Sequence, residues 1–321
     1  MTTTSMASIH DRLRHDDAGV RRIAVIDLPY TDEEDDIVPL LIAALSDADA
    51  TVRLEAAKAL EGFEEPEVLA AIAPLLKDED ADVRAAVAYT LAELKDSASA
   101  TALLPYLGDA DAEVQAAALQ AVKALRVDAA FDPAMAALAH ADAKVRRAAV
   151  SVLGYLKKPQ AISALTEVAA HDDDAEVRRV AVGALSFAND AEVSVHPALS
   201  RALADPVWQV REEAATTFAK TGSSLGVPNL VRAMDDEYWQ VRVKAARSLG
   251  KLKARDGVMA LVEALIHPVS NLRKEAVIAL GEIGDPRAIT PLERTLRDPD
   301  PDVRKLSKLA LTTIQMNGSA A

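Results

Sequence analysis

The chain contains no cysteine, and it is poor in aromatic residues and glycine. Of its 321 residues none is cysteine, 3% are aromatic and 12 are glycine. The absence of cysteine excludes disulfides, zinc sites built from thiolates and cysteine nucleophiles, and nothing in the composition indicates an oxidising compartment. We therefore expect a cytoplasmic protein.

Long hydrophobic runs are also lacking. No stretch of the sequence approaches the roughly 18 consecutive apolar residues that a membrane-spanning helix needs. Residues 1–8 have neither the positively charged start nor the apolar stretch of a signal peptide. We therefore expect no membrane segment and no targeting segment.

Recognisable catalytic and metal-binding motifs are absent from the sequence as well. It has no glycine-rich phosphate loop and no Ser-His-Asp arrangement in a supporting context. The acidic turns lack the ligand spacing of a calcium loop. His140, His171 and His267 stand where other parts of the chain have aspartate, so we expect them to cap turns rather than to bind metal. The sequence predicts no catalytic residue, no metal site and no cofactor.

What the sequence does contain is a valine-arginine pair that recurs every 31 to 33 residues. Leucine replaces the valine once, and glutamine replaces the arginine once, at Gln115. The pairs begin at Val20, Val52, Val83, Val114, Val145, Val177, Val210, Val241, Leu272 and Val303. Such a period is typical of one supersecondary unit stacked on itself, because a single helix pair cannot bury its apolar face alone. We predict an all-α fold, a right-handed α-solenoid of about ten two-helix repeats that forms one domain over residues 1–321.

Each repeat is expected to consist of two helices joined by an acidic turn. Around Val83, apolar residues at helical spacing over residues 66–77 predict a first helix, Asp78 to Asp80 form the turn, and a second helix follows to Leu94. In the last repeat Asp300 is placed as an N-cap with proline as the first helical residue, and we expect every second helix to begin in this way. Residues 1–17 are predicted to form a partial first unit, and residues 315–321 a frayed end.

The run Asp298-Pro-Asp-Pro-Asp-Val-Arg304, preceded by Ala279-Leu-Gly-Glu-Ile-Gly-Asp-Pro-Arg-Ala-Ile289, resembles the short HEAT-like repeat that is also found in phycobilisome lyases. The resemblance extends over nearly the whole chain. It implies a solenoid, and it allows bilin lyases, metal-dependent hydroxylases, assembly factors and scaffolds as functions. The hydroxylases carry repeated His-Glu pairs, and none of the six histidines here is followed by glutamate.

Charge is distributed unevenly along the chain, whose net charge is -14. Residues 31–113 hold 21 acidic and 5 basic residues, whereas residues 201–321 hold 15 acidic and 18 basic residues. Because the two ends of the solenoid differ in net charge, they are expected to orient a charged partner as it approaches. Nucleic acid is a disfavoured partner, because its phosphates need a continuous basic track that the acidic part interrupts. The repeated arginine is expected to pair with the acidic turns, forming a structural ladder.

Candidate binding residues emerge from positions at fixed offsets after each repeated valine, which we expect to face the concave side of the solenoid. Late in the chain these positions are basic, and aromatic residues precede the valine in two adjacent repeats, where we expect two stacked indoles. The predicted partner-binding residues are Trp208, Tyr238, Trp239, Lys244, Arg247, Lys251 and Lys274. An alternative is that the indoles only cover the turns between helices.

Two functions are compatible with this pattern. The first is a non-catalytic scaffold, or an assembly or maturation factor, that binds a partner protein such as an enzyme subunit in its concave groove. The second is a cofactor-handling or lyase-like protein in which a small apolar pocket near Tyr89, Tyr155 and Phe187 holds a small molecule. A tetrapyrrole is the ligand that the lyase resemblance implies.

Overall fold

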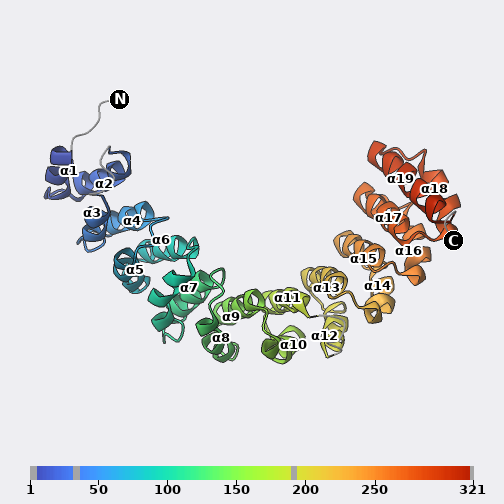
Figure 1. Ribbon diagram of the computed structural model, residues 1–321, viewed down its shortest axis with the longest axis horizontal. Coiled ribbons are helices and arrows are strands. Elements are labelled where there is room, and N and C mark those ends of the chain that lie inside the picture. The colour runs from blue at the N-terminus through green and yellow to red at the C-terminus, as the bar shows by residue number, and fades with distance from the viewer. Residues whose placement is uncertain (1–5, 32–36, 189–193, 319–321) are drawn as a thin grey trace. The chain divides into compact units, whose positions relative to one another are not determined.

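The structure, a computed structural model, describes residues 6–31, 37–188 and 194–318, and within these ranges it contains helices but no strand. Helices alternate in pairs along the chain (Figure 1). The predicted all-α solenoid is thereby confirmed. The pairs group into two compact units, Met1–Leu156 and Lys157–Ala321. That the whole chain is one domain stays a prediction.

The first unit contains five helix pairs in its described residues. Its second helices are α2 (Ala18–Asp27), α4 (Ala50–Ala59), α6 (Ala81–Ala92), α7 (Ala112–Val122) and α9 (Ala143–Leu156). The elements before them are α1 (Met6–Leu13), α3 (Ile37–Ala44), α5 (Pro66–Ile72) with η3 (Ala73–Lys77), η4 (Ser97–Ala102) with η5 (Leu104–Tyr106), and η6 (Asp128–Ala130) with α8 (Phe131–Ala137); η1 (Leu28–Tyr30) follows α2. Helix α1 packs on α2, so the described part of the first unit predicted for residues 1–17 supplies a first helix, and residues 1–5 lie outside the described ranges.

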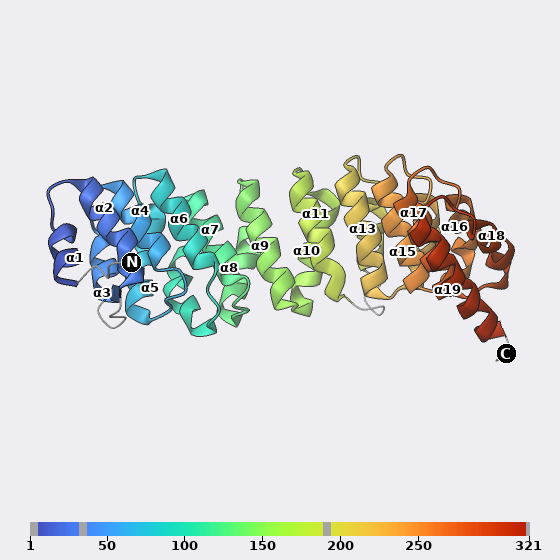
Figure 2. The ribbon, with the colours of Figure 1, turned by 90° about the horizontal axis from the view of Figure 1, so that it is seen from above.

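The second unit repeats this arrangement. Its second helices are α11 (Ala175–Ala184), α13 (Trp208–Thr221), α15 (Trp239–Lys251), α17 (Ser270–Ile283) and α19 (Pro301–Gly318). The elements before them are η7 (Pro159–Ala161) with α10 (Ile162–His171), α12 (Val195–Ala202), η9 (Ser224–Gly226) with α14 (Val227–Ala233), η10 (Arg255–Gly257) with α16 (Val258–Ala264), and η11 (Pro286–Ala288) with α18 (Ile289–Thr295); η8 (Leu185–Phe187) follows α11. The second helices lie side by side in one layer, as Figure 2 shows for α13, α15 and α17.

The chain's last helix corrects one expectation. Residues 315–318 are helical rather than frayed, because α19 meets no glycine or proline before Gly318. Residues 319–321 lie outside the described ranges.

Small buried residues allow the second helices to approach one another closely. The repeated valine is almost fully buried from Val52 onwards, and alanines surround it. A Cβ atom at Gly250 of α15 would lie 2.7 Å from the Cα atom of Ala279 of α17, so only glycine fits this crossing. The buried hydroxyl of Ser248 donates a hydrogen bond of 2.6 Å to the carbonyl of Ala215 in α13. The core therefore lies between the layers and between neighbouring second helices.

Helix starts agree with the predicted aspartate caps in most repeats. Asp80, Asp111 and Asp174 accept hydrogen bonds from the first amides of α6, α7 and α11. The prediction is wrong for α13, α15 and α17, which begin after Val207, Tyr238 and Val269 without a side-chain cap. The residue two positions earlier still accepts the amide at the cap position in these three repeats, as Asp78 does before α6.

Candidate interaction surface on the second unit

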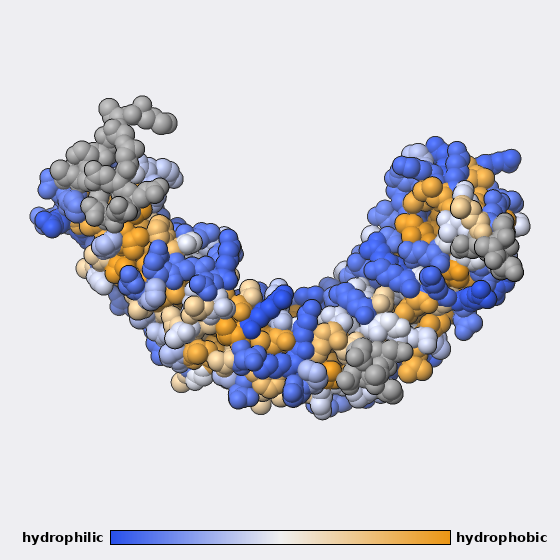
Figure 3. All heavy atoms as spheres, viewed as in Figure 1, coloured by the Kyte–Doolittle hydropathy of each residue, from blue (hydrophilic) through white to orange (hydrophobic). Residues whose placement is uncertain are grey.

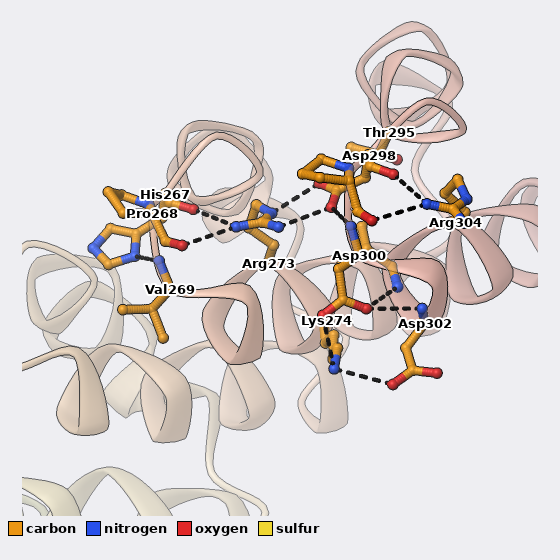
Figure 4. A network of polar contacts seen from close by, with 12 residues as sticks. His267, Pro268, Val269, Arg273, Lys274, Thr295, Asp298, Asp300, Asp302 and Arg304 are labelled. Carbon is orange, nitrogen blue, oxygen red and sulfur yellow. Dashed lines mark hydrogen bonds and ion pairs between the residues drawn. The ribbon is translucent and has the colours of Figure 1, made fainter.

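The repeated arginine links each acidic turn to the next. Figure 4 shows this for Arg273, whose NH1 group donates to the carbonyls of His267 and Pro268 in its own turn, at 2.9 and 3.1 Å. Its Nε and NH2 groups donate to the two carboxylate oxygens of Asp298 in the following turn, both at 2.8 Å. The bound guanidinium holds the pKa of Asp298 below its usual range. Arg273 is 8% exposed, so this is a largely buried bidentate pair.

We call such a pair a rung. The same contacts join further pairs of adjacent turns, which confirms the predicted arginine ladder at those positions. The rungs are Arg21–Asp47, Arg53–Asp78, Arg178–Asp205, Arg211–Asp236 and Arg273–Asp298. Gln115, the exception in the sequence, instead donates from its amide to the carbonyl of Leu107 at 2.9 Å. These arginines stabilise the stack and are not available for a ligand.

Two of the three turn histidines act as the sequence suggested. The Nδ1 atoms of His140 and His267 accept hydrogen bonds from backbone amides two residues later, at 3.0 and 3.1 Å. Each ring thereby replaces the aspartate that closes the turn in other repeats. His171 behaves differently, because its ring contacts Glu167 at 3.0 Å and Arg201 at 2.6 Å.

The aromatic residues of the predicted patch lie at the turns of the second unit. Trp208 stacks on Tyr238 of the next repeat, with ring centroids 5.5 Å apart and planes inclined by 14°. The guanidinium of Arg211 lies over the same tyrosine ring at 5.6 Å. The stacked ring is thus Tyr238, and the expected stack of two indoles is wrong. Trp239 makes no ring contact within the described ranges and is 37% exposed.

The basic residues of the predicted patch are mostly paired with acids on neighbouring second helices. Lys244 lies 3.7 Å from Glu212 of α13, and Arg247 pairs with Glu275 of α17. Lys274 lies 3.1 Å from both Asp300 and Asp302.

Lys251 is exposed and makes no ion pair in the described part of the chain. In Figure 3 the edge of this unit over α13, α15 and α17 is mostly hydrophilic. The surface is therefore a mixed-charge face of inter-repeat pairs, and the cationic wall that the residue types suggested does not form.

The three rings of the predicted small-molecule pocket lie on different repeats, in α6, α9 and η8. Tyr89 and Tyr155 are 60% and 43% exposed in the first unit, whereas Phe187 is half-buried in the second. Arg126 stacks over Tyr155 at 5.8 Å.

A cavity of about 560 Å³ lies elsewhere in the first unit, between α5–η3 and η4–η5. Its apolar lining includes Leu69, Pro74, Ala102, Pro105 and Tyr106. Sequence reasoning missed it. The available signal was the Ser- and Ala-rich segment before Pro105, which forms two short 3-10 helices instead of an α-helix.

Neither a membrane-spanning helix nor a metal-binding cluster occurs in the described residues. None of their helices combines the length and apolar character that crossing a bilayer requires. No group of three or more potential ligands among His, Asp and Glu side chains is placed there to hold a metal ion.

Comparison with known proteins gives a consistent picture of the fold. The family model for HEAT repeats matches residues 6–92, 38–123, 100–186, 131–219 and 227–312. No curated protein matches the chain in sequence.

Several solved structures are similar. An engineered protein shares 22% identity, with a TM-score of 0.54 over 96% of this chain and 98% of its own. A chain from a Kap95p structure with RanGDP shares 16% identity, with a TM-score of 0.58 over 96% of this chain and 45% of its own. A chain from the Kap95:Nup1 complex shares 15% identity, with a TM-score of 0.62 over 96% of this chain and 50% of its own. At these identities the likeness concerns the fold alone.

Proposed function

The chain belongs to the HEAT-repeat family, and from that premise we propose that it is a scaffold that binds a partner protein through the second unit. The observation that carries the proposal is the pair of exposed aromatic rings, Tyr238 and Trp239, which are 38% and 37% exposed. They lie at the start of α15, the helix that carries Lys244 and Arg247 of the mixed-charge face. Tryptophan, tyrosine and arginine dominate binding energy at protein interfaces. A pre-ordered surface also avoids much of the ordering cost of binding.

Two of the solved structures of the same fold concern Kap95 bound to another protein, RanGDP in one and Nup1 in the other. By analogy with that fold, a protein partner suits the present chain. We further propose the finer role of an assembly or maturation factor in the cytoplasm whose partner is an enzyme subunit. The role is non-catalytic, because the exposed face offers paired charges and rings rather than a nucleophile beside a base.

An affinity capture from the native host, followed by mass spectrometry, tests the scaffold role. We expect the full chain to retain a specific protein that Trp239→Ala loses by about tenfold, because removing a central ring weakens an interface most. Met259→Ala serves as control, since Met259 is 57% exposed on α16, in the other layer of the unit. Capture by neither the wild-type chain nor the control, or equal capture by all three, contradicts the proposal.

A second candidate function, cofactor handling, is supported by the cavity between α5–η3 and η4–η5. Its volume of about 560 Å³ and its apolar lining suit a small molecule or a tetrapyrrole fragment. The phycobilisome-lyase type of repeat is part of this proposal. Native mass spectrometry and an absorption spectrum of the protein purified from its host test it. A bound mass that disappears in Ala102→Phe, which fills the cavity, would favour this function, and a bare chain would argue against it.

A further inference from the structure

The same tryptophan-arginine pair occurs in two adjacent repeats of the second unit, but the residues that contact it differ. In α13, Trp208 and Arg211 are three residues apart and belong to the same face of the first turn. The next turn covers both of them. Asp236 gives its carboxylate to Arg211 at 2.6 and 2.9 Å, and Tyr238, two residues later, stacks on Trp208 at 5.5 Å. An acid and an aromatic residue two positions apart, Asp236 and Tyr238, thus cover the Trp208–Arg211 pair.

In α15 the equivalent pair, Trp239 and Arg242, has no such cover. The next turn presents His267, Pro268 and Val269 where the preceding repeat has Asp236, Glu237 and Tyr238. His267 is already engaged, because its Nδ1 atom accepts the amide of Val269 at 3.1 Å. We call the Trp208–Arg211 pair closed and the Trp239–Arg242 pair open. The open pair lacks the carboxylate and the aromatic ring that the next turn supplies to the closed pair.

The Arg242 guanidinium has few contacts. Its Nε donates to the backbone carbonyl of Asp236, while its two terminal nitrogens have no hydrogen-bond partner and no ion pair in the described part of the chain. The carboxylate of Asp236 is taken by Arg211. An arginine of this ladder with no acid in the following turn leaves an unmatched positive charge at the repeat boundary.

The open pair is reachable from solvent. The Trp239 side chain is 37% exposed, and Ile266, beside His267 in the facing turn, is 88% exposed. An exposed indole, an unmatched guanidinium and an exposed aliphatic side chain are the residue types that anchor a polypeptide ligand. The positive charge of Arg242 favours an acidic ligand.

We propose that Trp239 and Arg242 bind an acidic-aromatic segment of a partner protein, in which a carboxylate pairs with Arg242 and a ring two residues later stacks on Trp239. The chain itself contains the model for this ligand, since Asp236 and Tyr238 make the same two contacts to Arg211 and Trp208. This assignment rests on the proposed scaffold function, for which it specifies the chemistry of the partner.

The test uses the full chain and a dye-labelled peptide that carries Asp-Glu-Tyr between Gly-Ser flanks, with binding followed by fluorescence anisotropy. We expect saturable binding that weakens by about tenfold or more in Trp239→Ala and in Arg242→Gln. A peptide with Asn-Glu-Ala in place of Asp-Glu-Tyr should not bind. Lys220→Gln removes an exposed cation at the far end of α13 and should bind as wild type does.

The variant His267→Asp is the most direct test of the proposal, because it supplies the missing carboxylate from within the chain. This variant should melt at the same or a higher temperature and lose peptide affinity by about tenfold, since the introduced carboxylate then pairs with Arg242 as Asp236 pairs with Arg211. Retained affinity in His267→Asp or in Arg242→Gln, or no saturable binding by the wild-type chain, overturns the assignment. A host protein captured equally by wild type and Arg242→Gln would leave the scaffold function standing and remove only this site.

Discussion

Lys253 holds a backbone conformation that glycine adopts at lower cost. It follows α15 with a φ of 50°, while Gly222 and Gly284 occupy the same place after α13 and α17 with φ of 73° and 72°. A side chain in the left-handed region costs about 1 kcal/mol, because its Cβ crowds the backbone. We expect Lys253→Gly to raise the free energy of unfolding by about 0.5–1 kcal/mol, measured by urea denaturation.

The matched control is Gly222→Ala. A Cβ at Gly222 meets nothing within 4 Å, so any loss of stability comes from the backbone conformation alone. This variant should lower the free energy of unfolding by about 1 kcal/mol. A Lys253→Gly variant that is no more stable than wild type would show that the lysine is not strained.

His267 should make stability depend on pH near neutrality. Burial and the nearby guanidinium groups of Arg242 and Arg273 hold the pKa of His267 below its usual 6.5. A group whose pKa is lowered by folding contributes stability that is present above its unfolded pKa and is lost as pH falls through the folded pKa. Lowering the pH from about 8 to about 5 should therefore destabilise the wild type more than His267→Asn.

Asparagine is the suitable replacement because its side-chain oxygen can accept the Val269 amide without titrating. Urea denaturation of both proteins across this pH range gives the difference in unfolding free energy. The carboxylates common to both proteins cancel in that difference. If the difference is constant from about pH 8 to about pH 5, the neutral form of His267 is not required by the fold.

At the level of helices and turns, much was predictable from single repeats. The helix pairs, the aspartate caps in most repeats and the arginine ladder follow from local patterns at Val83, Asp300 and Arg273. The uncapped starts of α13, α15 and α17 were also visible in the sequence, since Val207, Tyr238 and Val269 stand at the cap position. The pattern of a single repeat does not reveal them, because the residue at the cap position changes from one repeat to another.

Contacts between repeats were harder to predict. That Tyr238 rather than Trp239 stacks on Trp208 depends on how far one helix is shifted along its neighbour. Likewise, exposed basic residues pair with acids on other helices, such as Glu212 and Glu275, and these pairs reduce the net positive charge of the surface. Composition along one helix carries no information on this cancellation.

The buried rung Arg211–Asp236 should be coupled more strongly than the exposed pair Arg247–Glu275. Only about a tenth of either side chain is exposed in the rung, against 47% of the arginine in the exposed pair. Although burial opposes ionisation of Asp236, the hydrogen bond from Arg211 lowers its pKa overall. A double-mutant cycle with Arg211→Gln and Asp236→Asn should give a coupling of about 2 kcal/mol.

The same cycle with Arg247→Gln and Glu275→Gln should give less than about 1 kcal/mol, because water screens an exposed pair. Glutamine is a fair replacement for the ladder arginine, since Gln115 occupies that position in another repeat and donates to a carbonyl. Unfolding free energies of all variants come from urea denaturation. Equal couplings for both pairs would contradict a structural role specific to the ladder.

At the scale of the whole molecule, stability in a stacked fold is a sum of repeats and of the interfaces between neighbours. The described helices contact mainly elements of their own repeat and of the neighbouring repeats, and they group into the units Met1–Leu156 and Lys157–Ala321. Destabilising one repeat should therefore affect its own unit most. The chain offers a direct way to observe this, because both of its tryptophans, Trp208 and Trp239, lie in the second unit.

We expect Val83→Ala to lower the unfolding midpoint seen by circular dichroism while leaving the midpoint seen by tryptophan fluorescence nearly unchanged. Val241→Ala should lower both, since Val241 is fully buried in the second unit, as Val83 is in the first. Each loss of a buried valine side chain should cost roughly 2–3 kcal/mol, so the shifts are measurable. If Val83→Ala moves both midpoints equally, the two units unfold as one cooperative block and the prediction of a single domain over residues 1–321 gains its first direct support.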